Sequence, residues 1–452
     1  MNIILLGIYI FVVMMVVISF FNLKLSIALF ISSLILIPYW EINFGGITID
    51  HNILNIVFIF SFFFYKKRNK SSLDFELIHP FIFLYISLLF LTFFTQSLPW
   101  LFQYTYWFGT LLKATVVSFI IWNVSKDDPK ILLYVKWSLI LSITLAGIYG
   151  VFLMKLGGFN PYTSFVSLYF GKKDAAFVYS LVTQSRFSFS NAGKIQSTMS
   201  HPMTWTLMLC FLFVVFFIYN KKEKKKYYWF ILGLLGFNIL ISGVRTGIAS
   251  LTLAFAYFFL RNIRIKIVVT GIMFLSMFYL IVSSNKDLSN IFISFVDVEG
   301  NQTNVGGSSL RMRLNQLDGV FNELQDQELF VGKGFGWTSY YQSNYGDHPT
   351  IKAFESLIFV ILCNSGLIGA VIWMMFFVKL FKKAREKLIF QNDIYLIDII
   401  IITYISYSIG TGEYSYIQYF SILYTFLISS LVKNQNAANN EYQYIREKQI
   451  TQ

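Results

Sequence analysis

Two features on which many protein classes depend are scarce in this sequence. Of its 452 residues, only two are cysteines and only 13% are charged, whereas about a quarter of the residues in soluble domains carry a charge. Both cysteines, Cys210 and Cys363, fall in apolar stretches, which excludes a disulfide or a cysteine metal site in the loops. The sequence also contains no P-loop, GxGxxG, HExxH or GxSxG motif. These absences exclude a soluble enzyme and a disulfide scaffold.

Apolar residues are abundant instead. Hydrophobic residues make up 56% of the chain and aromatic residues 19%, and the mean hydropathy is +0.61. Because one bilayer crossing takes about 20 apolar residues, we predict an all-α polytopic membrane protein, a single integral membrane domain over 1–452 with about 13 (12–14) transmembrane helices. The predicted spans are 2–22, 24–40, 47–65, 78–96, 100–123, 131–156, 203–220, 227–242, 247–260, 267–283, 354–380, 394–411 and 414–432.

The net charge of +13 reflects where the lysine and arginine residues lie. Most of them fall in short loops at 66–70, 221–226, 261–266 and 379–387 and near the C-terminal end, all on one side if the spans alternate. Cytoplasmic loops carry such an excess, so we expect the tail 433–452 to be cytoplasmic and the N-terminus to lie outside. The charge is then a topology signal and gives no evidence for nucleic-acid binding.

Two long segments, 157–202 and 284–353, fall on the opposite side as large outer loops. In the second, apolar residues recur every three or four positions and predict an amphipathic helix over about 308–327, with Arg311 and Arg313 in its first turn. Two interpretations stay open: a helix lying on the membrane surface, and a helix that presents arginine to a phosphate. The apolar residues are Leu310, Leu314, Leu317, Phe321 and Leu324.

The amphipathic stretch is followed by the segment GKGFGWTSYYQSNYGDHPTIKAFES at 332–356. Its three glycines predict a flexible turn. The aromatic residues after the turn fit an interfacial belt, or sugar contacts, because their rings combine apolar faces with polar tips. These residues are Trp337, Tyr340, Tyr341 and Tyr345.

Isolated basic residues on the same side are candidates for anion binding. Arg245 lies in SGVRTG, where a helix break would expose backbone amides beside a cation; an interfacial arginine that snorkels to headgroups is the alternative. In the first loop, Arg186 and Lys194 precede STMSHP. His201 in that motif is either a base or a polar residue at a helix start.

Glu355 lies at the mouth of the predicted span 354–380, which begins FESLIFVILCNSGLIG. It is a candidate general base, or an acid that interacts favourably with the helix N-terminus. His348 is the second candidate base, seven residues earlier in the same loop.

Four motifs together resemble the O-antigen polymerase and O-antigen ligase superfamily of bacterial membrane glycosyltransferases. KIQSTMSHPM (194–203) resembles the stretch that ends the family's first outer loop, and GVRTG (243–247) is similar to its Ser-Arg-Thr-Gly turn. LRMRLNQLDGVFNEL followed by GKGFG resembles its arginine-bearing helix and glycine turn, and FES with NSGLIG (364–369) its last outer-loop boundary. The similarity covers residues 180–380.

Two departures from the family pattern bear on the function. Lys194 stands where the family usually has arginine, and Ser197 replaces its glycine, so a bidentate phosphate contact gives way to a point charge. Ligases place a histidine where this sequence has Glu355, counted back from Gly366, and His348 does not align. This difference favours a polymerase over a ligase.

The resemblance implies a GT-C-like inverting glycosyltransferase that needs no metal or nucleotide cofactor, in the bacterial inner (plasma) membrane with its active site facing the periplasm. Its donor and acceptor would be glycans on undecaprenyl pyrophosphate, and a chain-length regulator is a further candidate partner. We expect Glu355, Arg245 and His348 to be catalytic. The expected pyrophosphate-binding residues are Arg186, Lys194, Arg245, Arg311 and Arg313, and the expected sugar-binding residues are Trp337, Tyr340, Tyr341, Tyr345 and His201.

Two rival functions remain at this stage. A ligase would transfer finished glycan to lipid A core. A flippase for lipid-linked oligosaccharides, or another secondary transporter, would show internal repeats and charges within several spans, and the sequence shows neither pattern clearly.

Overall fold

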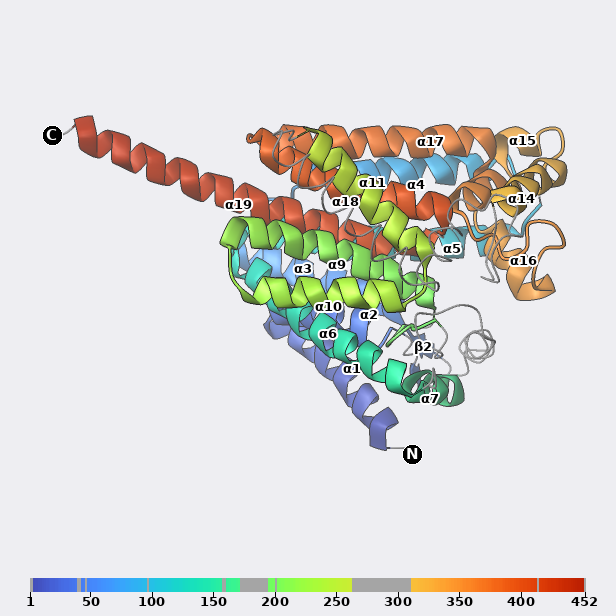
Figure 1. The fold of residues 1–452 in the computed structure, drawn as a ribbon, viewed down its shortest axis with the longest axis horizontal. Helices are drawn as coiled ribbons and strands as arrows, with labels where there is room; N and C mark the ends of the chain where they lie inside the picture. Colours follow the sequence, from blue (N-terminus) through green and yellow to red (C-terminus); the bar gives the residue numbers. More distant parts are fainter. Residues whose placement is uncertain are drawn as a thin grey trace, which may run out of the picture.

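The computed structural model describes residues 3–38, 42–44, 47–95, 97–156, 160–170, 194–199, 201–261, 310–412 and 414–450. These residues are almost entirely helical (Figure 1). The long helices are α1 (Ile3–Phe21), α2 (Leu23–Leu36), α3 (His51–Asn69), α4 (His79–Thr92), α5 (Trp100–Asp127), α6 (Lys130–Lys155), α9 (Pro202–Glu223), α10 (Tyr227–Ile241), α11 (Arg245–Arg261), α17 (Leu357–Lys387), α18 (Gln391–Gly410) and α19 (Ile417–Ile450). The shorter elements are α7 (Pro161–Phe170), α14 (Leu310–Glu323), α15 (Glu328–Val331), α16 (Trp337–Tyr345), the 3-10 helix η1 (Tyr414–Tyr416) and the strands β1 (Ile42–Phe44) and β2 (Ile47–Ile49).

The long helices confirm a polytopic helical membrane protein. Among the described residues, α5, α6, α9, α17, α18 and the first part of α19 are long and apolar enough to cross a bilayer, and α1, α2, α4 and α10 are shorter apolar helices. Each predicted span coincides with one long helix except 267–283, which lies outside the described residues.

The strands β1 and β2 form an antiparallel hairpin that the sequence pattern did not predict. Its register pairs Ile42 with Ile49 and Phe44 with Ile47. The hairpin shortens the predicted span 47–65, because α3 starts only after Asp50, whose side chain accepts the amides of Asn52 at 2.9 Å and Ile53 at 3.2 Å. Apolar residues in a short hairpin and at the end of a helix give the same composition signal, so apolarity alone did not separate them.

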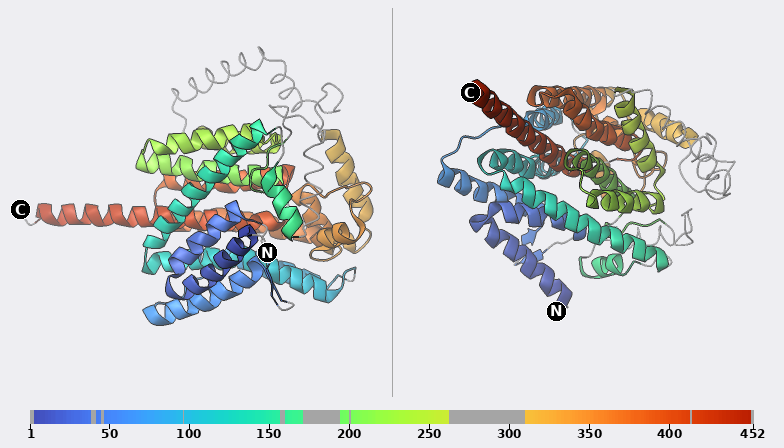
Figure 2. Two further views of the ribbon diagram at one scale, coloured as in Figure 1. Left: turned by 90° about the horizontal axis from the view of Figure 1, so that it is seen from below. Right: turned by 60° about the vertical axis from the view of Figure 1, so that its left-hand side comes forward.

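Helix α19 occupies the centre of the bundle. In the most apolar 18-residue stretch between Tyr414 and Gln435, 83% of the residues are buried, and the helix packs against α5, α18 and α9. Beyond that point it continues to Ile450 and projects away from the other helices, as the views in Figures 1 and 2 agree. The predicted tail 433–452 therefore begins as a continuation of this central helix.

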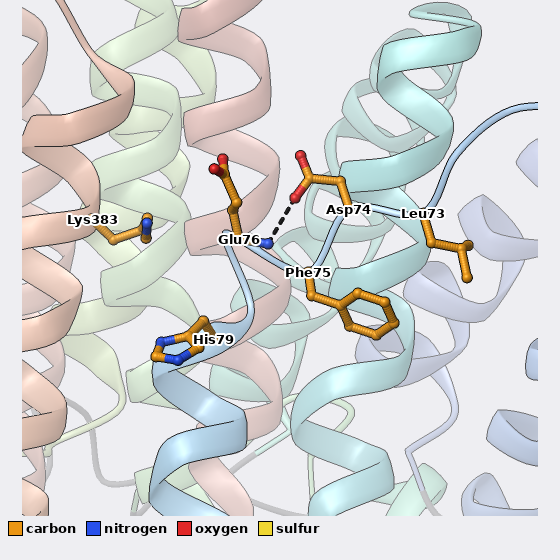
Figure 3. Close-up of a pocket in the computed structure, with 6 residues that line it drawn as sticks. All are labelled: Leu73, Asp74, Phe75, Glu76, His79 and Lys383. Carbon is orange, nitrogen blue, oxygen red and sulfur yellow. Dashed lines mark hydrogen bonds between the residues drawn. The ribbon is translucent and has the colours of Figure 1, made fainter.

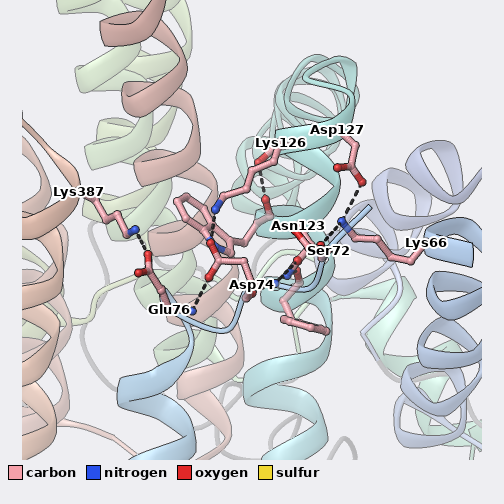
Figure 4. Close-up of polar contacts among 11 residues, drawn as sticks. Lys66, Ser72, Asp74, Glu76, Asn123, Lys126, Asp127 and Lys387 are labelled. Carbon is pink, nitrogen blue, oxygen red and sulfur yellow. Dashed lines mark hydrogen bonds and ion pairs between the residues drawn. The ribbon is translucent and has the colours of Figure 1, made fainter. Parts of the chain in front are cut away.

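Basic residues gather at the end of the bundle where α3, α5, α9 and α17 end, which we call the lysine-rich end. Ion pairs there join α3 to α5, and join α5 and α17 to the segment that connects α3 with α4 (Figure 4). This grouping agrees with the prediction that the basic loops share one side. The pairs are Lys66–Asp127, Lys126–Asp74 and Lys387–Glu76.

A surface hollow of about 620 Å³ lies at the lysine-rich end (Figure 3). The segment before α4 forms one side of it and α17 the other. The predicted site residues lie at the opposite end of the bundle, so this hollow is not part of the candidate site. The lining residues are Leu73, Asp74, Phe75, Glu76, His79 and Lys383.

At the opposite end, which we call the site end, the starts of α11 and α17 meet the end of α18. The Ser356 hydroxyl at the start of α17 donates to the Ile409 carbonyl at 2.7 Å. The hydroxyls of Thr246 and Thr411 lie 3.3 Å apart and join α11 to the end of α18. These contacts bring together segments that lie far apart in the sequence.

Candidate active site

The central contact of the candidate site is an ion pair between α14 and the start of α17. Arg313 Nη2 lies 2.8 Å from Glu355 Oε2, and both side chains are partly buried. An arginine–carboxylate contact at this distance is a charge-assisted hydrogen bond. Two residues that the sequence singled out for different roles therefore touch each other.

The backbone around Glu355 is held in place from two sides. Its carbonyl accepts the Gly412 amide at 2.9 Å, and the next residue, Ser356, caps α17 by accepting the Ile358 amide at 3.3 Å. On its other side Phe354 adopts a left-handed conformation with φ of 49°. Its ring is buried, and burial of the ring offsets the cost of a left-handed non-glycine residue. The carboxylate thus stands on a fixed backbone.

The helical phase of α14 separates the two candidate arginines. Residues two positions apart differ by about 200° around a helix, so Arg311 and Arg313 lie on different faces. Arg313 reaches Glu355, whereas Arg311 is exposed. Its position in the first turn agrees with the predicted helix, which the structure places at Leu310–Glu323.

Arg245 is the first residue of α11 and lies at the site end. The preceding Gly243 has φ of 66°, and the hydroxyl of Ser242 contacts the Val244 amide at 3.4 Å. The next residue, Thr246, packs against Gly410 so closely that a Cβ on that glycine would lie 2.5 Å from its methyl group. Because Gly412 bonds to Glu355, Arg245 and Glu355 flank the same short segment of chain, residues 410–412.

Lys194 and His201 lie on either side of a tightly held turn before α9. Ser197 in this turn has φ of 50°, and its buried hydroxyl donates to the Ala146 carbonyl at 2.6 Å. His201 caps α9, because its Nδ1 accepts the Met203 amide at 3.1 Å. Burial, and then the positive charge of Lys194, lower the pKa of His201 to about 4. At neutral pH the ring is uncharged and its Nε2 carries the proton, which suits it to donate a hydrogen bond rather than to accept a proton.

His348 uses both ring nitrogens inside its own segment. Its Nδ1 accepts the amides of Thr350 at 3.3 Å and Ile351 at 3.2 Å, and its Nε2 lies 3.2 Å from Glu323 Oε2. The ring is buried. Both ring nitrogens are therefore engaged within the segment, and the less buried Glu355 is the more accessible of the two candidate bases.

Glu323 ties the end of α14 to the loops around it. Its Oε1 accepts from Lys333 Nζ at 2.6 Å, and its Oε2 faces His348. Burial favours the protonated carboxyl, but the hydrogen bond and positive charge of Lys333, together with the hydrogen bond to His348, outweigh it and hold the pKa of Glu323 below its usual range. Glu323 therefore stays ionised and anchors α14 at its C-terminal end.

The predicted aromatic residues form a packed cluster around α16. Trp337 is buried, with its ring 5.2 Å from Tyr341 and 5.7 Å from Phe354, and Lys333 Nζ lies 5.0 Å from its ring centre. Tyr340 packs on α5 through Phe102, 5.1 Å away.

The edge of this cluster carries the ring that solvent reaches most easily. Tyr345 is 70% exposed, and its ring lies 5.2 Å from that of Tyr341. Its ring is open to solvent, whereas the buried Trp337 ring packs α16 against its neighbours.

The glycine turn before α16 docks on a kink in α17. The amides of Lys333 and Gly334 donate to the carbonyls of Cys363 at 2.8 Å and Asn364 at 3.2 Å, which the kink at Gly366 (φ 62°) leaves available. A Cβ on Gly332 would lie 2.3 Å from the Ser365 amide. The turn was predicted to be flexible; it is instead bound to α17, and glycine is needed for close approach.

Sequence reasoning missed two residues that shape this region. Asn364 accepts the Thr338 amide with its side chain at 2.9 Å and so joins α16 to the kink, and Gln316 lies buried on α14. The run Asn-Ser-Gly inside an apolar span was a signal for the kink, because a glycine beside polar residues marks a break in such a helix. No sequence signal marked Gln316.

Two expectations remain beyond what the structure describes. Arg186 lies outside the described residues, as does the predicted span 267–283. Over the described ranges, no group of three His, Cys, Asp or Glu side chains is placed to hold a metal ion.

The arrangement at the site end falls largely within a segment that is similar to a known family. Residues 230–374 match the family model described as O-antigen ligase. The matched segment is about a third of the chain, and it contains Arg245, Arg313 and Glu355, whereas Lys194 and His201 precede it. No curated protein matches the sequence. The match to the O-antigen ligase model supports the resemblance to the superfamily of ligases and polymerases, and it does not separate one activity from the other.

Proposed function

We propose that the protein is a membrane glycosyltransferase that polymerises undecaprenyl-pyrophosphate-linked repeat units on the periplasmic side of the bacterial inner membrane. The growing glycan is transferred from its lipid pyrophosphate to the non-reducing sugar of another lipid-linked unit. The Arg313–Glu355 ion pair carries the proposal, because it joins a cation suited to pyrophosphate and a carboxylate suited to an acceptor hydroxyl.

The reaction requires two bond changes at the anomeric carbon and one proton transfer from the acceptor hydroxyl. The acceptor hydroxyl oxygen bonds to the anomeric carbon of the donor, and the bond from that carbon to the phosphate oxygen breaks. The undecaprenyl pyrophosphate leaves with the bonding electrons, and the hydroxyl proton passes to the Glu355 carboxylate. A positioned base of this kind contributes about 10²- to 10⁴-fold to a rate.

The leaving pyrophosphate gains negative charge as the bond breaks, so it needs fixed cations in a partly dry site. We infer that it competes with Glu355 for Arg313, whose planar guanidinium matches phosphate oxygens. Once Arg313 turns to the phosphate, Glu355 loses its partner and becomes available as the base. Arg245 and Lys194, at the same end of the bundle, add positive charge for this group.

A ligase that transfers glycan to lipid A core is the second candidate, and the description of the matched family model favours it. The glutamate at position 355 supports a polymerase, because the ligases that this sequence resembles have a histidine at the equivalent position. A flippase has no comparable support.

Expression of the chain in a bacterial strain that lacks its own polymerase tests the proposal. A polymerase restores a ladder of repeat lengths on gels of the surface polysaccharide. A single repeat attached to core would instead indicate a ligase. The flippase is tested in a strain that lacks this chain. If repeat units still accumulate where periplasmic enzymes can reach them, the chain is not required to move them across the membrane, which contradicts a flippase.

A further inference from the structure

Gln316 on α14 is a buried polar side chain whose amide has no hydrogen-bond partner among the residues that the structure describes. The side chain is 1% exposed, and neither Nε2 nor Oε1 forms a hydrogen bond. One turn earlier, Arg313 Nη1 is also buried without a hydrogen bond, although its Nη2 bonds to Glu355. Residues three positions apart on a helix are neighbours, so both buried groups without partners belong to the same turn of α14, and one of them belongs to the residue that bonds to the candidate base.

Packing alone does not require glutamine at this position. Val320, one turn further along the same buried face, is apolar and completely buried. A methionine at 316 would fill a similar volume and bury no unmet polar atom, whereas a buried amide without partners destabilises a fold. A destabilising polar group beside a candidate active site therefore points to a ligand that satisfies it.

The donor and acceptor pattern identifies the class of ligand. An amide donates through Nε2 and accepts through Oε1, and the guanidinium of Arg313 only donates. A phosphate accepts hydrogen bonds only and would leave Oε1 unmet. A sugar hydroxyl both donates and accepts, so a glycan satisfies all of the unmet atoms.

We propose that Gln316 binds a hydroxyl of the acceptor sugar and sets its position beside Glu355; this rests on the function proposed above. The acceptor sugar gains access to the buried Gln316 through the way in which α14 is held. Its C-terminal end is anchored through Glu323 and Lys333, and its other end through the Arg313–Glu355 pair. Release of that pair by the donor pyrophosphate frees the turn that carries Gln316.

The test compares the purified wild-type chain with Gln316→Met in detergent. A repeat unit extracted as its undecaprenyl pyrophosphate serves as donor, and a repeat unit on an alkyl chain without pyrophosphate serves as acceptor only. We expect Gln316→Met to unfold at the same temperature as the wild type or higher, and its KM for the acceptor to rise about tenfold or more. The KM for the donor stays unchanged.

Asn55→Leu is the matched control. Asn55 on α3 is fully buried, and both of its amide atoms lack a hydrogen bond, but α3 packs on α1, α2 and α5 rather than on α14. This variant removes the same kind of unmet group elsewhere, so it should keep the wild-type KM. An equal rise in KM for both variants would show a general effect of core changes and would overturn the proposal.

If Gln316→Met has the same KM for the acceptor as the wild type, the inference is overturned, while the proposed function stays intact. If that variant does not fold, Gln316→Asn decides by the same criterion, because it keeps the amide but withdraws it by one methylene. Absence of transfer by the wild type would instead contradict the proposed function.

Discussion

Arg313 and Glu355 are 42 residues apart in the chain, yet Nη2 of the first lies 2.8 Å from Oε2 of the second. The contact spans from the first half of α14 to the residue before the cap of α17. In this state each charge neutralises the other, and neither is fully available to a substrate. A ligand that takes one partner therefore changes the reactivity of the other, which links pyrophosphate binding to base catalysis.

Replacement of the carboxylate tests the role of the base. Glu355→Gln keeps the size of the side chain and an oxygen that can accept from Arg313, but it removes the group that takes the proton. We expect polymerisation in membranes to fall about 10²- to 10⁴-fold, with an unchanged amount of protein. Ladder formation in the complementation strain and transfer by the purified chain measure the effect.

Glu386→Gln provides the control for this variant. Glu386 is exposed in α17 at the lysine-rich end and pairs with Lys383, so the same chemical change there should leave transfer at the wild-type rate. Near-normal ladders from Glu355→Gln would remove this residue from the mechanism.

The guanidinium of Arg245 is the second charge to test. We expect Arg245→Ala to lower transfer by about a hundredfold through lost stabilisation of the leaving pyrophosphate, and Arg245→Lys to recover only part of it, because a point charge replaces a planar fork. Transfer rates at saturating donor give the measurement. Arg68→Ala, at an exposed position of α3, should have no effect; equal losses in both variants would indicate a general influence of charge.

The bundle could be predicted from the sequence because its signals are local. Long apolar runs mark α5, α9 and α18, and lysines in short loops mark one end. The site could be predicted only in part, since its geometry depends on long-range contacts. Periodicity places Arg311 and Arg313 on one helix, but which of them faces Glu355 depends on how α14 packs against segments far away in the sequence, and the structure shows that it is Arg313.

The contacts that the site residues make could not be predicted from the sequence either. His348 and Glu355 looked like alternative bases in the sequence, and only the structure shows that the histidine is bound to Glu323. The flexible turn expected from the glycines is docked on α17 through the kink at Gly366. Pairing across tens of residues has no signature in composition or spacing.

The docked glycine turn can be tested with two alanine variants. Gly332 and Gly346 have nearly the same φ, 76° and 79°, in a region that other residues rarely adopt, so either substitution costs about 1–3 kcal/mol of backbone strain. At Gly346 an added Cβ meets nothing within 4 Å, whereas at Gly332 it meets the Ser365 amide. Gly332→Ala should therefore lower the unfolding temperature further than Gly346→Ala. Equal losses would show that the turn does not press on α17.

The cap of α9 predicts how stability depends on pH. The pKa of His201 is lowered from its usual 6.5 to about 4 in the folded protein, so on acidification the unfolded chain binds the proton first. Stability is therefore unaffected by this group above about pH 6.5, falls between about pH 6.5 and 4 by about 3 kcal/mol at most, and changes no further below that range.

His201→Asn isolates this effect, because asparagine can still cap α9 but does not titrate. In detergent, the unfolding temperature of the wild type should fall more than that of His201→Asn between pH 7.5 and pH 4.5. Other carboxyl groups, among them Glu323, titrate in both proteins and cancel in the comparison. Parallel curves for the two proteins would mean that the His201 ring is solvated and becomes charged in the folded state. The pKa of His201 would then not be lowered by burial.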